Sequence, residues 1–178
     1  MKNLLTAAFV YLLFTAPAYS QPFPALRAQN LQDKDVTLPD YVKDKRAVIC
    51  LAFSVKADES LKKWIQPLYN QLIADGMGGL MGGNMYNANL CFVAMLRGIA
   101  KMGMGELKSR SKKSIDPRLH SLFLISDDDA DALMQQLKIT DKNEPHFIVV
   151  DEKGNILFQT WGAYSDKKME SITDALLK

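Results

Sequence analysis

A proline-led hairpin pattern between residues 143 and 162 constrains the fold of this chain more than any other stretch. Two compact apolar runs rich in β-forming residues, 147–150 and 156–158, flank a polar connection. That connection contains Gly154, which can take the positive φ that a tight turn requires. Pro145 precedes the first run, and because proline has no N–H to donate, it belongs at the start of a strand. The stretch therefore predicts two antiparallel strands joined by a tight turn.

The rest of the chain alternates between the patterns of buried strands and amphipathic helices. Continuous apolar runs predict strands that are buried on both faces, and apolar residues at helical spacing predict helices that pack on them. The strands expected on this basis are residues 47–53, 90–96, 122–125, 147–150 and 156–158. The helices expected are residues 58–74, residues 98–113, a segment opened by residues 126–129 and a terminal helix capped by Ser165. This order predicts an α/β domain with a central sheet flanked by helices.

Three further features of the chain qualify this pattern. Residues 23–39 contain few apolar side chains and predict two short extended segments at the edge of the sheet. Asp58 or Ser60 is expected to cap the first helix, and Pro67 is expected to kink or interrupt it. Residues 75–89 are rich in glycine and methionine and predict a loop.

The first twenty residues have the pattern of a cleaved signal peptide. Lys2 supplies positive charge, residues 4–14 are apolar, and Ala18 and Ser20 are small residues at the two positions that a signal peptidase reads. The apolar run is shorter than the ~20 residues that a membrane-spanning helix needs. We therefore expect cleavage after Ser20, a periplasmic or secreted protein, and one domain over residues 21–178. A membrane anchor is the alternative interpretation of the same run.

The composition argues against several classes of function. The chain has 178 residues, of which 48% are hydrophobic, and a net charge of +2. A nearly neutral chain of this hydrophobicity is neither disordered nor typical of a nucleic-acid-binding protein. We expect no nucleic-acid partner and, after cleavage of the signal peptide, no membrane-spanning segment.

The two cysteines, Cys50 and Cys91, both lie inside apolar runs. A buried cysteine commonly acts as a small hydrophobic side chain. An exported protein can also join two cysteines in a disulfide. We favour two free, buried thiols and leave one disulfide as the alternative.

Residues 23–68, 119–139 and 147–172 resemble the thioredoxin-like assembly factor for the membrane sector of mitochondrial ATP synthase. In particular, VVDEKGNILFQTWG resembles the leucine-valine-aspartate turn of that family, which leads to a tryptophan and a glycine. More generally, the chain is similar to peroxiredoxin-like and periplasmic thioredoxin-like domains. The resemblance implies a thioredoxin-like fold with a mixed sheet, an N-terminal extension, an inserted strand–helix unit and a cis peptide bond before Pro145.

The reactive cysteines of thioredoxin-like enzymes are missing from their expected place. Such enzymes carry a cysteine where the first core strand meets the next helix, because the helix N-terminus lowers the pKa of a thiol. Here the positions of a Cys-x-x-Cys motif are expected near Asp58 and Leu61. Neither Cys50 nor Cys91 lies there. We expect a redox-inactive protein that is not an enzyme. A thiol-disulfide oxidoreductase or a peroxiredoxin-like antioxidant protein that uses one of these thiols is the enzymatic alternative.

Three methionines in the loop, Met77, Met81 and Met85, are spaced by four residues. Thioethers are soft ligands for Cu(I), so a methionine-rich copper-binding protein is a second alternative. Adaptable apolar packing explains the same residues without a metal. We therefore expect no metal and no other cofactor.

The function that these observations favour is a protein-binding or assembly-type module. The expected contact surface is the region that carries the active site in the redox relatives, where a shallow groove can dock an extended chain. The residues expected to form this surface are Lys56, Asp58, Glu59, Ser60, Met77, Met81, Met85, Pro145 and His146. The expected partner is a protein, with a membrane-associated complex as one candidate. The sequence leaves the partner's identity and the oligomeric state open.

Overall fold

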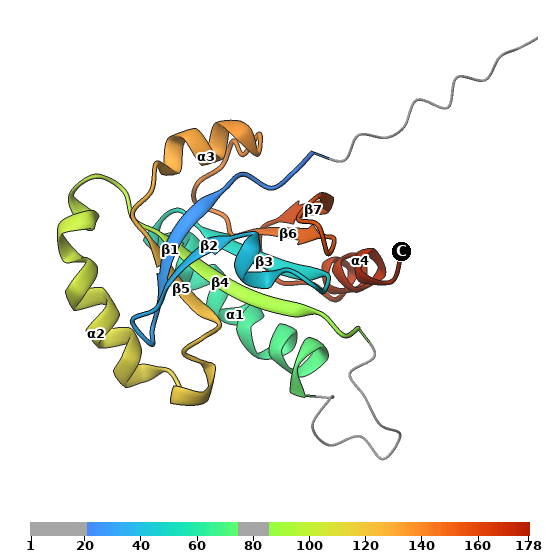
Figure 1. Cartoon of the computed structure of the whole chain (residues 1–178), viewed down its shortest axis with the longest axis horizontal. Coiled ribbons are helices and arrows are strands. Elements are labelled where there is room, and N and C mark those ends of the chain that lie inside the picture. Colours follow the sequence, from blue (N-terminus) through green and yellow to red (C-terminus); the bar gives the residue numbers. More distant parts are fainter. Residues whose placement is uncertain (1–20, 75–85) are drawn as a thin grey trace, which may run out of the picture.

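A single mixed sheet runs through the centre of the protein. The computed structural model describes residues 21–74 and 86–178. Within them, seven strands form one sheet in the order β2-β1-β5-β4-β3-β6-β7 (Figure 1). The strands are Leu26–Asn30 (β1), Asp35–Leu38 (β2), Ala47–Ala52 (β3), Asn89–Met95 (β4), Phe123–Ser126 (β5), His146–Val150 (β6) and Ile156–Trp161 (β7). The α-helices are Val55–Leu72 (α1), Met104–Ser114 (α2), Ala130–Gln136 (α3) and Asp166–Leu177 (α4). The expected α/β domain with a central mixed sheet is confirmed. The predicted signal peptide lies outside the described residues.

The pairing of the strands confirms the predicted hairpin. Strand β6 is antiparallel to β7, and a bulge interrupts their register between Val149 and Val150. Strand β3 is parallel to β4 and antiparallel to β6, so it is an inner strand of the sheet with a partner on each side. Strands β1 and β2 form an antiparallel hairpin beside β5, which places the N-terminal extension at the sheet edge as expected.

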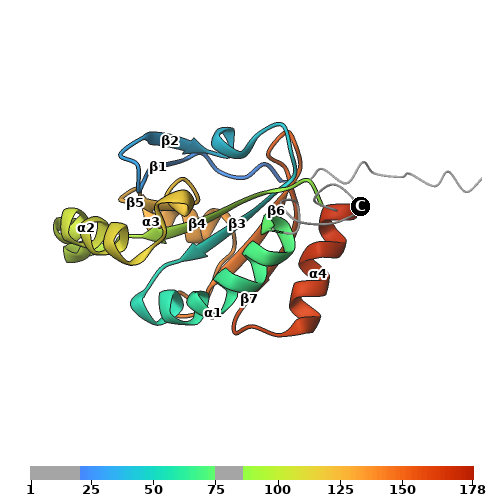
Figure 2. The ribbon, with the colours of Figure 1, turned by 90° about the horizontal axis from the view of Figure 1, so that it is seen from below.

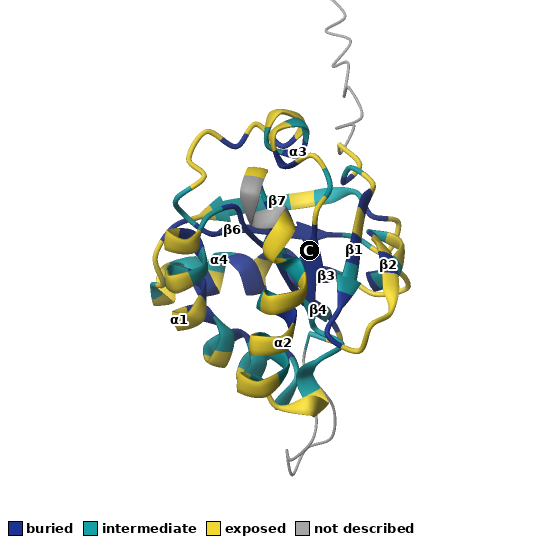
Figure 3. Cartoon of the chain, turned by 90° about the vertical axis from the view of Figure 1, so that its left-hand side faces the viewer, coloured by how far each residue is buried: buried dark blue, intermediate teal, exposed yellow. Residues whose placement is uncertain are grey.

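Two apolar layers cover the two faces of the sheet. On one face, α1 and α4 lie next to each other (Figure 2) and pack on side chains such as Val48, Cys50 and Phe147. On the other face, α3 and the β1–β2 hairpin pack on side chains such as Ile49 and Cys91. Because successive strand residues point to opposite faces, neighbours in β3 belong to different layers. Buried residues accordingly fill the central strands β3 and β6, and exposed residues lie on the outer sides of the helices (Figure 3).

Helix α1 begins earlier than predicted and is not interrupted. Its N-cap is Ser54, whose Oγ accepts a hydrogen bond of 3.1 Å from the backbone N–H of Ala57. The predicted caps, Asp58 and Ser60, are therefore wrong; Asp58 lies in the first turn, where a negative charge favours the helix dipole. Pro67 lies inside the helix without ending it. Because Pro67 has no N–H, the backbone carbonyl of Lys63, four residues earlier, loses its helical hydrogen bond. Lys63 is exposed, so water can hydrate this carbonyl.

Two other expectations differ from the structure. The predicted helix over residues 98–113 is divided into a 3-10 helix, Gly98–Gly103, and α2, because Gly103 forms a non-helical N-cap. The cis peptide bond found among the described residues joins Leu38 to Pro39, so the cis bond implied before Pro145 is not present. Pro145 still precedes β6 as predicted, and its carbonyl accepts a hydrogen bond of 2.9 Å from the N–H of Gly162.

The turn between β6 and β7 provides a test of this arrangement. Gly154 has a φ of +85°, and a Cβ there would lie 2.5 Å from Cγ of Pro39. We expect Gly154→Ala to lower the free energy of unfolding by roughly 1–3 kcal/mol, because the backbone is strained for alanine and the proline ring must move. Chemical denaturation measures this change.

Gly105 in α2 is the matched control, because a Cβ at this position meets no atom of the described residues within 4 Å. We expect Gly105→Ala to be neutral or to stabilise the protein by up to ~1 kcal/mol, the helix-propensity difference. Equal losses for the two variants would contradict the account of the turn.

Candidate functional site

Three segments that are distant in the sequence meet at one end of the sheet. Leu51 near the end of β3 lies opposite His146 at the start of β6, and His146 lies opposite Trp161 at the end of β7. Helix α1 begins only three residues after the last residue of β3. The structure therefore brings the predicted residues of α1 to the same end of the sheet as the predicted turn at Pro145 and His146.

The first turns of α1 present charged and apolar side chains to the outside. Lys56 and Glu59 are exposed, whereas Asp58 and Ser60 are half-buried. Asp58 forms an ion pair of 3.1 Å with Lys62 one turn later, and such exposed pairs contribute little stability. No cysteine occurs in this segment, so the helix N-terminus has no thiol whose pKa it could lower.

The turn at Pro145 and His146 is buried, contrary to its expected place on the contact surface. His146 is 3% exposed, and its Nε2 lies 2.7 Å from the carbonyl oxygen of Asp141. Because a carbonyl oxygen can only accept a hydrogen bond, Nε2 of His146 must carry the ring proton and donate it. Nδ1 of the neutral ring is then a hydrogen-bond acceptor. Nδ1 is buried and has no hydrogen-bond partner among the described residues. Burial lowers the pKa of His146 from its usual value of 6.5, although the bond to Asp141 opposes this change.

Aromatic rings enclose this histidine. The ring of Phe53 meets it edge-on at a centroid distance of 6.2 Å, and the ring of Trp161 lies nearly parallel to it at 6.4 Å. The adjacent loop is fixed to α1, because Nε1 of Trp64 donates a hydrogen bond of 3.1 Å to the carbonyl of Gly162. The side chain of His146 therefore lies beneath the surface and does not form part of it.

The surface at this end is instead formed by apolar side chains that sequence reasoning missed. Val55 is 77% exposed, Trp161 is 56% exposed and Tyr164 is 37% exposed. The ring of Tyr164 packs edge-on against buried Trp64 at a centroid distance of 5.0 Å. One sequence signal was present. Trp161 follows the polar residues Gln159 and Thr160 at the end of a strand, and polar residues on both faces indicate that this part of the strand is outside the core.

The two cysteines lie in the core, and their predicted free and buried state is confirmed. In the parallel pairing of β3 and β4, Cys50 lies opposite Phe92 and Cys91 lies opposite Ile49. The two thiols belong to different apolar layers and so point to opposite faces of the sheet. Burial raises the pKa of Cys91 to about 12 and that of Cys50 well above its usual value. Neither thiol is therefore placed to form a thiolate or a disulfide.

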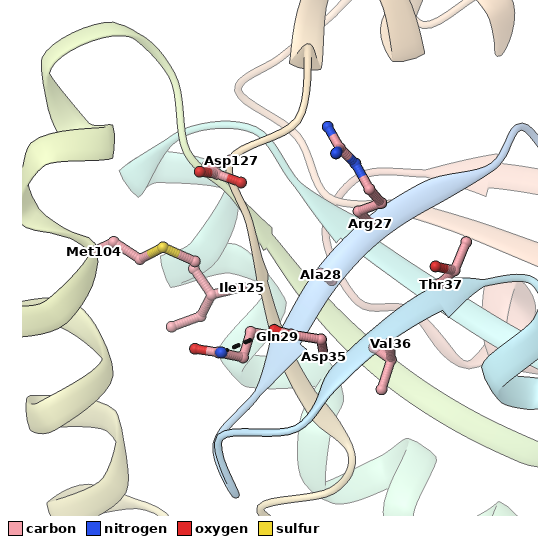
Figure 4. Close-up of a pocket in the computed structure, with 9 residues that line it drawn as sticks. All are labelled: Arg27, Ala28, Gln29, Asp35, Val36, Thr37, Met104, Ile125 and Asp127. Atoms are coloured by element: carbon pink, nitrogen blue, oxygen red, sulfur yellow. Dashed lines mark hydrogen bonds between the residues drawn. The ribbon is translucent and has the colours of Figure 1, made fainter.

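A depression lies beside β1, β2 and β5, at the other side of the sheet order from β6 and β7 (Figure 4). Its volume is about 640 Å³, and Arg27, Gln29, Asp35, Met104 and Asp127 are among its lining residues. The polar side chains already have internal partners, since Arg27 pairs with Asp128 at 2.7 Å and Gln29 bonds Asp35 at 2.9 Å. We assign no chemistry to it.

The predictions on metal binding and on membrane-spanning segments can be compared with the described residues only. Met77, Met81 and Met85 lie outside the described residues, so their roles in copper binding or partner contact stay predictions. In residues 21–74 and 86–178, no three His, Cys, Asp or Glu side chains are grouped so that they could hold a metal ion. Within the same residues, no helix is long and apolar enough to cross a membrane.

The number of reactive thiols can be counted directly in the native and in the unfolded protein. We expect no thiol to react with an aromatic disulfide reagent in the native protein, because both sulfur atoms are fully buried. In denaturant we expect both thiols of Cys50 and Cys91 to react. A thiol that reacts rapidly under native conditions, or none that reacts after unfolding, would contradict the buried, unpaired state.

The lowered pKa of His146 predicts a dependence of stability on pH. Between the folded pKa and 6.5 the unfolded chain binds more protons at this site, so stability falls as the pH falls below 6.5. The contribution is at most ~1.4 kcal/mol for each pH unit. We expect His146→Gln, which keeps a donor for Asp141, to flatten the curve of unfolding free energy against pH in this window.

A steeper loss of stability in acid for His146→Gln than for the wild-type protein would contradict a neutral, buried His146.

Comparison with known proteins agrees with this fold. The family model described as ATP10 protein matches residues 13–177, which is nearly the whole chain. No curated protein matches. Among solved structures, the thioredoxin domain of a thiol-disulfide oxidoreductase from Bacteroides vulgatus is 16% identical, with a TM-score of 0.59 over 88% of this chain and 96% of that one.

Two further solved structures are similar. StoA from Bacillus subtilis is 13% identical, with a TM-score of 0.52 over 85% of this chain and 97% of that one. A thiol:disulfide interchange protein from Chlorobium tepidum is 12% identical, with a TM-score of 0.52 over 89% of this chain and 94% of that one. At such identities these similarities show the thioredoxin-like fold alone. With the match to the family model, they confirm the expected fold and the resemblance: the chain belongs to the ATP10 protein family of ATP synthase assembly factors.

Proposed function

We propose that this protein is an exported, redox-inactive thioredoxin-like module that docks on a protein partner during assembly of a complex. The observation that carries the proposal is the junction of β3 and α1. Ser54 caps the helix there, where a redox enzyme of this fold needs a cysteine, and the spacing of a Cys-x-x-Cys motif corresponds to Ser54 and Ala57. This assignment replaces the expected positions near Asp58 and Leu61, because α1 begins at Val55.

The core positions of Cys50 and Cys91 argue against the enzymatic alternative. A thiol-disulfide oxidoreductase or a peroxiredoxin-like enzyme attacks its substrate with an accessible thiolate. Both sulfur atoms are fully buried, and burial raises the pKa of each thiol. Use of either cysteine would require the central strands of the sheet to open.

The proposed contact region is the exposed end of the sheet, which we call the α1-start surface and define by Val55, Lys56, Glu59, Trp161 and Tyr164. Exposed apolar side chains bordered by charged ones are typical of protein-binding surfaces, and tryptophan and tyrosine commonly dominate their binding energy. The bond from Trp64 to Gly162 and the contact of Trp64 with Tyr164 hold this surface in place before a partner binds. Such preorganisation lowers the entropic cost of docking.

The proposed export of the protein and the proposed class of its partner rest on other observations. The charged, apolar and small-residue segments of the first twenty residues support export through a cleaved signal peptide. Membership of the ATP10 protein family supports a protein partner in a complex, with a membrane-associated complex as the candidate. A methionine-rich copper-binding role is not favoured by any described residue.

Redox inactivity is tested in an insulin-reduction assay and a peroxide-consumption assay. We expect the wild-type protein to be inert in both, because the helix start has no thiol. The positive control is the double variant Ser54→Cys/Ala57→Cys, which places two thiols at the start of α1 with Cys-x-x-Cys spacing. Wild-type activity that disappears in Cys50→Ser or Cys91→Ser would overturn the proposal.

Docking is tested with a photo-crosslinking residue at Lys56 and, as the control, at Lys153 in the turn at the opposite end of the sheet. Both positions are exposed lysines. We expect specific adducts in the envelope fraction from position 56 only, and Val55→Asp should reduce them several-fold, because it places a charge in the apolar contact. Adducts that form equally from both positions, or only from position 153, would contradict the proposed surface.

A further inference from the structure

Helix α2 has fewer buried contacts with the rest of the protein than α1 or α4 has. In the described part of the chain, Lys108 is the one buried residue of α2, whereas α1 and α4 each bury five residues. The apolar side chains of α2 pack on a small cluster of described residues in which Leu31, Leu96 and Ile125 are buried. The side chain of Met104 points toward Ile125 in this cluster (Figure 4). A segment with so few buried apolar contacts opens locally more readily than the core does.

The sequence of α2 also gives the helix little stability of its own. It has 11 residues, and isolated helices of this length are marginal in water. Its N-cap is Gly103, which has no side chain to cap the helix, whereas Ser54 and Ser165 cap α1 and α4. Gly105 in the first turn weakens the helix further relative to alanine. The position of α2 therefore depends on contacts outside the helix.

Two ion pairs to the turn between β1 and β2 supply such contacts. Nζ of Lys108 lies 2.5 Å from Oδ1 of Asp33, and Nζ of Lys112 lies 2.5 Å from Oδ2 of the same carboxylate. We call these two ion pairs the Asp33 clamp. Hydrogen bonds from Lys108 and Lys112 lower the pKa of Asp33 to about 2. The Asp33 side chain is 63% exposed, so dissolved ions can screen the clamp.

The turn that carries Asp33 is held in place by the side chain of Asn30. Asn30 is buried, and its Oδ1 accepts hydrogen bonds of 2.9 Å and 3.0 Å from the backbone N–H groups of Gln32 and Lys34. Asp33 lies between these two residues, with a φ of +65°. Of the two sides of the clamp, α2 is therefore the one that can move.

The two ends of residues 98–114 allow this segment to move as a piece. Gly98, with a φ of +52°, begins the segment, and Gly103 separates the 3-10 helix from α2. After α2 the backbone is extended at Ile115, whose carbonyl oxygen lies 2.9 Å from Nε2 of His120. This contact fixes the chain just after the helix. The segment can therefore leave the sheet while β4 and β5 stay paired.

We propose that residues 98–114 open from the sheet as one unit, and that the Asp33 clamp makes this opening depend on ionic strength. In the closed state, the clamp and the apolar contact of Met104 hold α2 against the sheet. At high salt the clamp is screened, and the opening exposes Leu31, Leu96 and Ile125. The inference does not depend on the proposed function, because the residues that define the α1-start surface lie outside this segment.

Hydrogen exchange of the purified protein, measured by mass spectrometry, tests the opening. We expect the amides of residues 104–114 to exchange at least about tenfold faster than the slowest amides of α1 and α4. This difference should grow between about 0.01 M and about 1 M salt, where the Debye length falls from ~30 Å to ~3 Å. Asp33→Asn should speed the exchange of α2 and remove its salt dependence, since asparagine tolerates the positive φ but carries no charge. The matched control is Asp40→Asn, which removes an exposed ion pair with Lys43.

A thiol probe tests what the opening exposes. Leu31 and Leu124 are both 1% exposed, but only Leu31 belongs to the cluster next to α2. The thiol of Leu31→Cys should react with a thiol reagent faster at high salt, and that of Leu124→Cys should not. The native thiols are buried and add no background.

Four results would each overturn the proposal. They are α2 amides as protected as those of α1, an equal effect of Asp33→Asn and Asp40→Asn on α2, faster exchange of the whole sheet in Asp33→Asn, and a Leu31→Cys thiol whose reaction rate does not change with salt.

Discussion

The burial of β3 between β4 and β6 is the constraint on which the rest of the structure depends. All six of its residues are buried, and they alternate between the two apolar layers. A strand in this position determines which side chains face α1 and α4 and which face α3. It also determines where the chain must leave the sheet, and therefore where α1 begins. Cys50 belongs to this strand, so its thiol packs in the core, where burial raises its pKa.

The end of β3 is the place where thiol enzymes of this fold carry their reactive cysteine, and here it carries Ser54. In this geometry a helix N-terminus, the start of β6 and the end of β7 meet, whatever residue caps the helix. The Ser54 hydroxyl caps the helix at this position. Val55, Trp161 and Tyr164 remain exposed around this end. This end of the sheet is therefore the region at which we propose docking.

Local patterns predicted most of the sheet, because buried strands and a proline-led turn are marked by their own residues. The hairpin of β6 and β7 and the unpaired cysteines of β3 and β4 agree with the structure for this reason. The start of α1 was misplaced because several residues, Ser54, Asp58 and Ser60, are all good caps. Only the end of β3 decides among them.

The candidate site was harder to predict from the sequence than the fold. Whether Pro145 and His146 are exposed depends on the packing of Phe53 and Trp161 around them, which local sequence does not encode. The exposure of Trp161 likewise depends on β7 being an edge strand, a property of the sheet order. The apolar part of the α1-start surface therefore emerged only from the three-dimensional arrangement.

Hydrogen exchange of the protein with and without its captured partner tests the central claim most directly. If the α1-start surface docks the partner, the amides of residues 55–60 and 161–164 should exchange more slowly in the complex. The turn of residues 151–155, at the opposite end of the same hairpin, should exchange at an unchanged rate. Protection confined to that opposite end, with residues 55–60 unaffected, would contradict the account.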